Sequence, residues 1–75
     1  MDLNEFVKHF ASQFDETPAS EFVPTTVFKN LEEWSSLTAL SVIAMVDEEL
    51  DIRITGADIR NSSSIEDLFS TIQAK

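Results

Sequence analysis

The chain has 75 residues, and a chain of this length buries enough apolar surface for only one modestly stable domain, spanning residues 1–75. It carries 14 acidic and 5 basic residues, and the resulting net charge of −9 repels phosphate backbones, so we expect no nucleic-acid partner. The absence of cysteine excludes disulfides and thiolate metal sites, and because nothing in the chain needs an oxidising compartment, we expect a cytoplasmic location. No apolar run approaches the length of a membrane span, so we expect no membrane insertion.

A first amphipathic helix is predicted over residues 2–15. Asp2 and Glu5 have the spacing of a capping box, which predicts that the helix begins at the start of the chain. His9, beside Lys8, is expected to face solvent. The apolar stripe has spacings of three and four residues and consists of Leu3, Phe6, Val7, Phe10 and Phe14.

A long loop is predicted from Glu16 to Trp34, because helical periodicity is lost there and Pro18 and Pro24 interrupt the chain. Loops of this length in a small domain are usually functional or packed by their own side chains. The apolar residues available for such packing are Phe22, Val23, Phe28, Leu31 and Trp34.

A second helix is predicted from Ser36 to Leu50, with the Ser35 hydroxyl as its N-cap. Apolar residues cover more than half of its circumference: Leu37, Ala39, Leu40, Ile43, Ala44, Val46 and Leu50. The remaining narrow polar stripe consists of Thr38, Ser41, Glu48 and Glu49. Met45 falls within this stripe, where it is either an exposed apolar group among acids or covered by a neighbouring loop.

The last third of the chain predicts two further helices. Ile52 and Ile54 alternate over too few residues for a sheet and are expected to tuck into the core as a loop. Thr55 with Asp58 resembles a capping box for a short helical turn, and Ser64 is predicted to cap a final helix. That helix carries an apolar stripe of Ile65, Leu68, Phe69 and Ile72. The expected fold class is all-α, a four-helix bundle with three longer helices and one short one.

The residue inventory does not favour an enzyme. The only histidine has no cysteine or serine partner in an obvious position, and a single glycine cannot build a phosphate-binding loop. The acidic run Asp47, Glu48, Glu49 and Asp51 lacks the alternating pattern of a calcium loop. We therefore expect no catalytic and no metal-binding residues.

Two serines stand at the start of the second helix. On spacing alone, Ser35 and Ser36 are ordinary cap and first-turn residues. The alternative is that Ser36 is an attachment point, because a phosphodiester there would lie beside the free N–H groups and the positive end of the helix dipole.

The segment from Trp34 through Ser36 and Leu37 to Leu50 resembles the phosphopantetheine attachment region of acyl carrier proteins, whose motif is D-S-L. The resemblance extends over nearly the whole chain and includes Thr17-Pro18 and an F-x-x-L pattern in the long loop. It implies a bundle of the acyl-carrier-protein type and a covalent 4′-phosphopantetheine, donated by coenzyme A, on Ser36. It also implies that Leu37 anchors the helix beneath this serine. Ser35 stands where the family usually has Asp, and it is itself a good N-cap.

The resemblance also implies partners for the chain, which is expected to be a monomer. A phosphopantetheinyl transferase would modify it, and acyl-transferring or acyl-activating enzymes with basic docking patches would then bind it. The partner-binding residues implied for this chain are Leu37, Met45, Asp47, Glu48 and Glu49. The residues implied to shelter an acyl chain between the second and third helices are Ile43, Val46, Ile54 and Ile59.

The function implied is that of a carrier, which holds an acyl or aminoacyl group as a thioester and delivers it to partner enzymes. Fatty acid biosynthesis is one setting for such a carrier, and the sequence leaves polyketide, aminoacyl and other dedicated pathways open. The alternative is an unmodified acidic interaction module that uses the same bundle to bind a basic protein.

Overall fold

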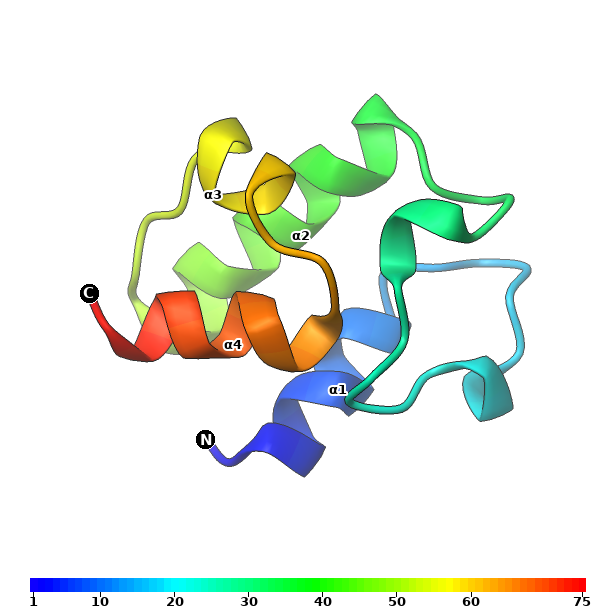
Figure 1. Ribbon diagram of the computed structural model, residues 1–75, viewed down its shortest axis with the longest axis horizontal. Helices are drawn as coiled ribbons and strands as arrows, with labels where there is room; N and C mark the ends of the chain where they lie inside the picture. Colours follow the sequence, from blue (N-terminus) through cyan, green and yellow to red (C-terminus); the bar gives the residue numbers. More distant parts are fainter.

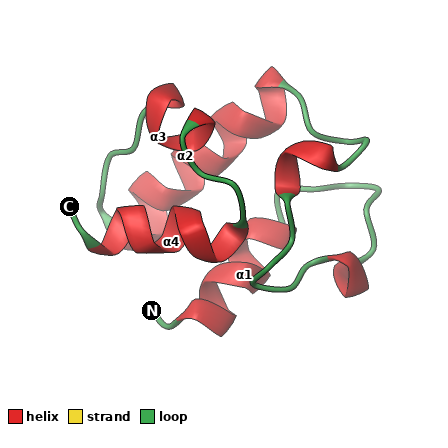
Figure 2. Cartoon of the chain, viewed as in Figure 1, coloured by secondary structure: helices red, strands yellow, loops and turns green.

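Every regular element of the chain is helical, as Figures 1 and 2 show for a computed structural model that describes residues 1–75. The four α-helices are α1 (Leu3–Ala11), α2 (Ser36–Leu50), α3 (Gly56–Arg60) and α4 (Ile65–Gln73). Two short 3-10 helices, η1 (Ala19–Glu21) and η2 (Phe28–Asn30), lie in the connection between α1 and α2. The prediction of an all-helical bundle with three longer helices and one short one is confirmed.

Local hydrogen bonds place the helix starts where the sequence predicts them. The side chains of the cap residues accept backbone N–H groups three residues further on: Asp2 from Glu5, Thr55 from Asp58 and Ser64 from Asp67. The first two are complete capping boxes, because the acid also accepts the N–H of the cap residue. These starts are therefore determined by short-range chemistry that is independent of the tertiary packing.

The first helix is shorter than predicted, because local side chains compete for its last carbonyls. α1 ends at Ala11 instead of Asp15. The His9 carbonyl, which would accept the Gln13 N–H in a longer helix, accepts the Ser12 hydroxyl at 2.7 Å and the Gln13 side-chain amide at 3.1 Å. Beyond this turn, the Asp15 N–H donates to the Glu33 carboxylate at 2.6 Å. Phe14 is still buried, because the chain makes a tight turn in which the Phe14 N–H donates to Ala11.

The four helices enclose one apolar core. Figure 1 shows α4 crossing in front of α2, α1 beneath α4, α3 above it, and the long connection forming one side of the molecule. α4 contacts both α1 and α3, and α1 contacts α2. The fully buried apolar side chains of the core are Phe6, Phe10, Phe28, Val42, Val46, Ile65, Leu68 and Ile72.

Phe10 lies at the centre of an aromatic cluster that orders the long connection. Its ring centroid is 5.2 Å from Phe28, 6.3 Å from Phe22 and 6.4 Å from Trp34, all of which belong to residues 16–34. Aromatic pairs at these separations gain free energy beyond their buried area. The prediction that this loop is packed by its own side chains is confirmed for Phe22 and Phe28, both buried, and for the half-buried Trp34.

The prediction is wrong for Val23, which is 49% exposed. Val23 follows the inward-pointing Phe22, and neighbouring residues in extended backbone direct their side chains to opposite sides. Its backbone N–H donates to the Thr26 hydroxyl at 2.9 Å, which holds this part of the connection at the surface.

The bounds predicted for the second helix are confirmed, from Ser36 to Leu50. Asp51 ends α2 in the left-handed conformation, with φ 54° and ψ 39°, and its N–H closes the last turn on the Asp47 carbonyl. After glycine, Asp and Asn tolerate this conformation better than the other residues do. Ile54 then enters the core without forming a strand, as predicted.

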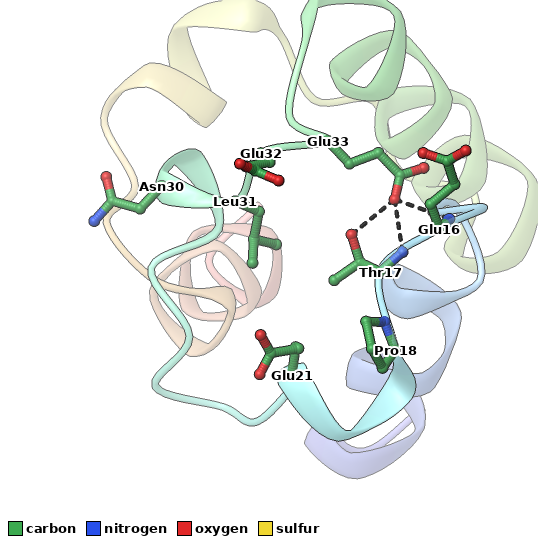
Figure 3. Close-up of a pocket in the computed structure, with 8 residues that line it drawn as sticks. All are labelled: Glu16, Thr17, Pro18, Glu21, Asn30, Leu31, Glu32 and Glu33. Carbon is green, nitrogen blue, oxygen red and sulfur yellow. Dashed lines mark hydrogen bonds between the residues drawn. The ribbon is translucent and has the colours of Figure 1, made fainter.

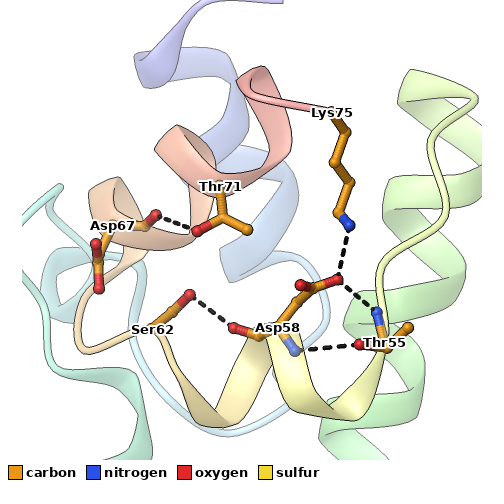
Figure 4. A network of polar contacts seen from close by, with 6 residues as sticks. All are labelled: Thr55, Asp58, Ser62, Asp67, Thr71 and Lys75. Carbon is orange, nitrogen blue, oxygen red and sulfur yellow. Dashed lines mark hydrogen bonds and ion pairs between the residues drawn. The ribbon is translucent and has the colours of Figure 1, made fainter.

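Polar contacts from Lys29 and Lys75 connect the short helix α3 to the rest of the molecule. The Asp58 carboxylate accepts the Thr55 N–H at 2.9 Å and pairs with Lys75 at 3.1 Å (Figure 4). The Thr55 N–H, and after it the Lys75 ammonium, hold the pKa of Asp58 below its usual value. At the other end, the Lys29 ammonium donates to the Arg60 carbonyl at 2.8 Å. These contacts hold α3, although only its Ile59 side chain is buried.

Replacing the central ring of the aromatic cluster should destabilise the whole domain. We expect Phe10→Ala to lower the free energy of unfolding by about 3–5 kcal/mol, because a fully buried ring leaves a cavity. Val23→Ala, which truncates an exposed residue of the connection, should change it by less than about 0.5 kcal/mol. Urea denaturation followed by circular dichroism measures both values. A similar loss in the two variants would contradict the packing described for this connection.

Candidate functional site

The sequence-predicted site begins at the first turn of α2. Ser35 has extended backbone angles, φ −155° and ψ 176°, and its hydroxyl accepts the Thr38 N–H at 3.3 Å. Ser36 is the first residue of the helix and is exposed. The first N–H groups of a helix have no partner within the helix, so they point out of this end with a partial positive charge. The Ser36 hydroxyl therefore lies at a position where an attached anion would be stabilised.

Thr38 has a different place from the one predicted. The sequence puts it in a solvent-facing polar stripe, but its side chain is buried. Its hydroxyl donates to the Glu33 carbonyl at 3.0 Å and lies 3.2 Å from the Ser35 hydroxyl. Thr38 thus connects the cap of α2 to the segment that precedes it.

Trp34 anchors the residues immediately before the cap. Its ring is nearly parallel to that of Phe10, with an interplanar angle of 6°, and meets Phe28 edge-on at 4.9 Å. Its centroid is 6.3 Å from that of Phe14. Because three rings of the aromatic cluster pack near Trp34, the residue that leads into Ser35 and Ser36 is anchored to the core.

The Glu33 carboxylate is the most densely hydrogen-bonded side chain near the site. It accepts the N–H groups of Asp15, Glu16 and Thr17 at 2.6, 3.0 and 2.8 Å, and the Thr17 hydroxyl at 2.7 Å. Figure 3 shows the Thr17 and Glu16 contacts. The Thr17 hydroxyl has the largest effect on the pKa of Glu33 and lowers it below the usual value; desolvation opposes this shift, and the three backbone N–H groups reinforce it. No sequence motif indicated this role.

An open, acidic cavity of about 780 Å³ lies beside this carboxylate (Figure 3). Glu16, Glu21 and Glu32 contribute acidic side chains to its wall, whereas Leu31 is the one hydrophobic residue. Its acidic residues come from both ends of the connection between α1 and α2. The sequence did not predict this cavity, because residues 16–21 and 30–33 meet only in the folded chain.

The exposed face of α2 differs from the predicted one. Met45 is only 5% exposed, whereas Leu37 is 77% and Leu40 is 61% exposed. Of the two alternatives for Met45, exposure among acids is therefore wrong. Met45 borders a cavity whose wall also includes His9 of α1 and Ser12 and Gln13 of the connection that follows it. The family resemblance implied that Leu37 anchors the helix, but its exposed side chain does not do so.

The reason is that apolar residues occupy too much of α2 to identify its inner side. The buried stripe runs through Thr38, Val42, Met45 and Val46, at the i, i+4, i+7 and i+8 positions of one helix face. The opposite side presents Leu37 and Leu40 together with the exposed acids Asp47 and Glu48, and Glu49 is also exposed. We call Leu37, Leu40, Asp47 and Glu48 the outer face of α2.

His9 is half-buried, so the prediction that it faces solvent holds only in part. An open cavity of about 310 Å³ between α1 and α2 is lined by His9 together with Glu48 and Glu49. The acidic end of α2 therefore lies beside the last turn of α1.

The residues implied to shelter an acyl chain are packed in the core. Val46, Ile54 and Ile59 are buried and belong to the same apolar cluster, and Ile43 packs against it while partly exposed. The structure thus brings these four side chains together in one apolar cluster.

Comparisons with known proteins give no match: no family model, no curated protein and no solved structure is significantly similar to the chain. Within the structure, no group of three or more His, Asp or Glu side chains is arranged to hold a metal ion. None of the helices combines the length and the apolar character needed to cross a membrane.

The Glu33 contacts should make stability depend on pH in a defined direction. Because the folded-state pKa is lowered, the ionised carboxylate stabilises the fold fully at neutral pH, and this contribution is lost as the pH falls below the usual value of 4.5 toward the folded-state pKa. We expect Glu33→Gln to have a lower free energy of unfolding than the wild type at pH 7. The difference should shrink progressively as the pH is lowered from 5 to 3.

The control is Glu32→Gln, which removes the same charge from an exposed neighbour. Denaturant titrations of the three proteins at each pH separate the Glu33 effect from the general relief of charge repulsion on acidification. A constant difference between wild type and Glu33→Gln across this range would show that the Glu33 charge does not stabilise the fold.

Proposed function

We propose that the chain is a carrier domain, of the acyl-carrier-protein kind, in which Ser36 bears a 4′-phosphopantetheine arm. The observation that carries this proposal is the exposure of Ser36 on the first turn of a capped helix, directly after backbone held by Trp34. A modifying enzyme can reach such a hydroxyl, while the surrounding structure keeps its position defined. The resemblance of residues 34–50 to the family's attachment region supports the same function.

The proposed modification forms one phosphodiester bond. The Ser36 oxygen attacks the phosphorus that bears the pantetheine group of coenzyme A, adenosine 3′,5′-bisphosphate leaves, and the hydroxyl proton passes to a base of the transferase. The new anion lies by the free N–H groups of α2. The thiol at the far end of the arm then holds an acyl or aminoacyl group as a thioester, and partner enzymes perform the chemistry on this group.

A sheltered cargo would have to open the core between α2 and α3. Val46, Ile54 and Ile59 would be the apolar lining, and they are closely packed in the unloaded chain. Since α3 buries only Ile59 and is held by two lysine contacts, moving it away would expose less apolar surface than moving any longer helix. We therefore place the proposed cargo site on the α3 side of α2.

Loading should depend on Ser36 and not on Ser35. After incubation with coenzyme A and a broad-specificity phosphopantetheinyl transferase, intact mass should increase by one phosphopantetheinyl group in the wild type and remain unchanged in Ser36→Ala. The variant should stay folded, because Ser36 is exposed and Ala is a good helix former. Ser35→Ala is the matched control: it should still accept the group, with a loss of about 1 kcal/mol in stability from the missing cap.

Two outcomes would count against this proposal. A wild type that gains no mass would favour the unmodified interaction module. A Ser36→Ala protein that gains the full adduct would move the attachment to another hydroxyl, with Ser35 as the next candidate.

The outer face of α2 is the proposed docking surface for partner enzymes. Leu37 and Leu40 offer apolar contact next to Ser36, and Asp47 and Glu48 add negative charge toward the other end of the helix. A partner that combines a hydrophobic contact with a basic patch matches this arrangement. Met45 has no part in this proposal, because it is buried.

The apolar and the ionic contributions to the affinity for such a partner should be separable by their different dependence on salt. With the transferase as the partner, we expect Leu37→Ala to raise the Kd by about tenfold and to leave the salt dependence unchanged, because an apolar contact is not screened. Glu48→Lys should weaken binding chiefly at low salt. Val27→Ala, which truncates an exposed apolar residue outside α2, should bind like the wild type. A Kd unaffected by Leu37→Ala would exclude this face from docking.

The second candidate function is an acidic interaction module that is never modified. The exposure of Leu37 and Leu40 favours it as much as it favours a carrier, since either needs a partner for this face. The two functions differ at Ser36: the module gains no mass from coenzyme A, and its binding to basic partners is unchanged by Ser36→Ala.

A further inference from the structure

Glu33 connects two segments that are distant in the sequence, the exit of α1 and the start of α2. Its carboxylate binds residues 15–17 at the exit of α1, and its carbonyl accepts the Thr38 hydroxyl in the first turn of α2. Thr38 in turn contacts Ser35 through its N–H and its hydroxyl. Glu33 and Thr38 thus link the end of α1 to the cap that immediately precedes Ser36.

The contacts made by Glu33 are stronger than those of the cap itself. Ser35 is neutral, and its hydroxyl accepts the Thr38 N–H at 3.3 Å, a long hydrogen bond. The Glu33 carboxylate accepts four hydrogen bonds of 2.6–3.0 Å, which are charge-assisted and therefore about twice as strong as neutral ones. The carboxylate thus fixes the position of Glu33, two residues before the cap, and the Glu33 carbonyl accepts the Thr38 hydroxyl in the first turn of α2.

Glu33 is not available as a ligand of the acidic cavity that it borders. Three donors from Glu16 and Thr17 meet Glu33 Oε1 and the Asp15 N–H meets Oε2, so most of the accepting capacity of this carboxylate is used within the chain. Glu32, in the same cavity wall, is exposed. The structure thus gives these neighbouring acids different roles, one internal and one facing solvent.

We propose that Glu33 is a positioning residue for the modification of Ser36, acting through Thr38 and the backbone before the cap. This inference rests on the proposed carrier function. Glu33 does not touch the reacting atoms. It restricts the backbone of residues 33–35, and so limits the orientations in which the Ser36 oxygen can meet the phosphorus of coenzyme A. The outer face of α2, which binds the transferase, does not include Glu33.

The separation of positioning from docking predicts a specific kinetic effect. Misplacing a reacting group by about 1 Å can cost roughly 100-fold in rate. A loosened but folded start of α2 should therefore lower the kcat of loading by about tenfold. The KM for the carrier should change by less than about twofold, because the docking residues are intact. A purely structural residue would lower the amount of active protein without producing this split.

The experiment measures steady-state loading of folded wild type, Glu33→Gln and Glu32→Gln by one transferase with coenzyme A. We expect a lower kcat only for Glu33→Gln, with Glu32→Gln matching the wild type. Amide hydrogen exchange at Thr17 reports the contact independently of loading, and should accelerate in Glu33→Gln alone. Thr17→Val, which removes only the hydroxyl contact, should lie between wild type and Glu33→Gln in kcat.

The outcomes separate this inference from the proposed function. If the wild type loads and Glu33→Gln exchanges the Thr17 amide rapidly but keeps the wild-type kcat, Glu33 stabilises the loop without positioning Ser36, and the inference is wrong. If Glu33→Gln does not fold, Thr17→Val decides, and an unchanged kcat in that variant overturns the inference. A wild type that does not load at all overturns both the carrier function and the role of Glu33.

Discussion

The packing of aromatic rings around Phe10 is the interaction on which the rest of the structure depends. A 75-residue chain without disulfides has little core to spare, and the connection between α1 and α2 is too long to be ordered by its own backbone. Phe22, Phe28 and Trp34 from that connection all approach Phe10. The burial that stabilises the bundle therefore also orders the segment that delivers Ser35 and Ser36 to the start of α2.

Hydrophobic packing alone would leave this segment free to slide, because it has no directional preference. The Glu33 carboxylate makes directional contacts, because it accepts hydrogen bonds from three consecutive residues. These bonds fix how residues 15–17 lie against the segment that contains Glu33. The same carboxylate accepts the backbone amides of residues 15–17, just beyond the end of α1. One side chain thus closes the long connection and holds the backbone before the proposed attachment site.

The central helix α2 has two apolar sides with different consequences. One side, which includes Val42 and Val46, is fully buried in the core. The other side leaves Leu37 and Leu40 exposed to solvent near Ser36. Hydration of these apolar side chains is unfavourable in an isolated domain, and a partner that covers them would explain their exposure. The acids at the far end of α2 give that partner a charge preference. In the proposed carrier, attachment and docking therefore share one helix.

The sequence by itself determined the features that depend on near neighbours. Asp2, Thr55 and Ser64 predict the helix starts, and Ser35 with Leu50 bounds the central helix, because caps and periodicity act within a few residues. Tertiary structure alone decided the burial of Met45, the exposure of Leu37 and the role of Glu33. Because α2 is apolar over more than half of its surface, its sequence pattern does not identify the buried side. The donors to the Glu33 carboxylate could not be predicted, because Asp15 and Glu33 are 18 residues apart and meet only in the folded chain.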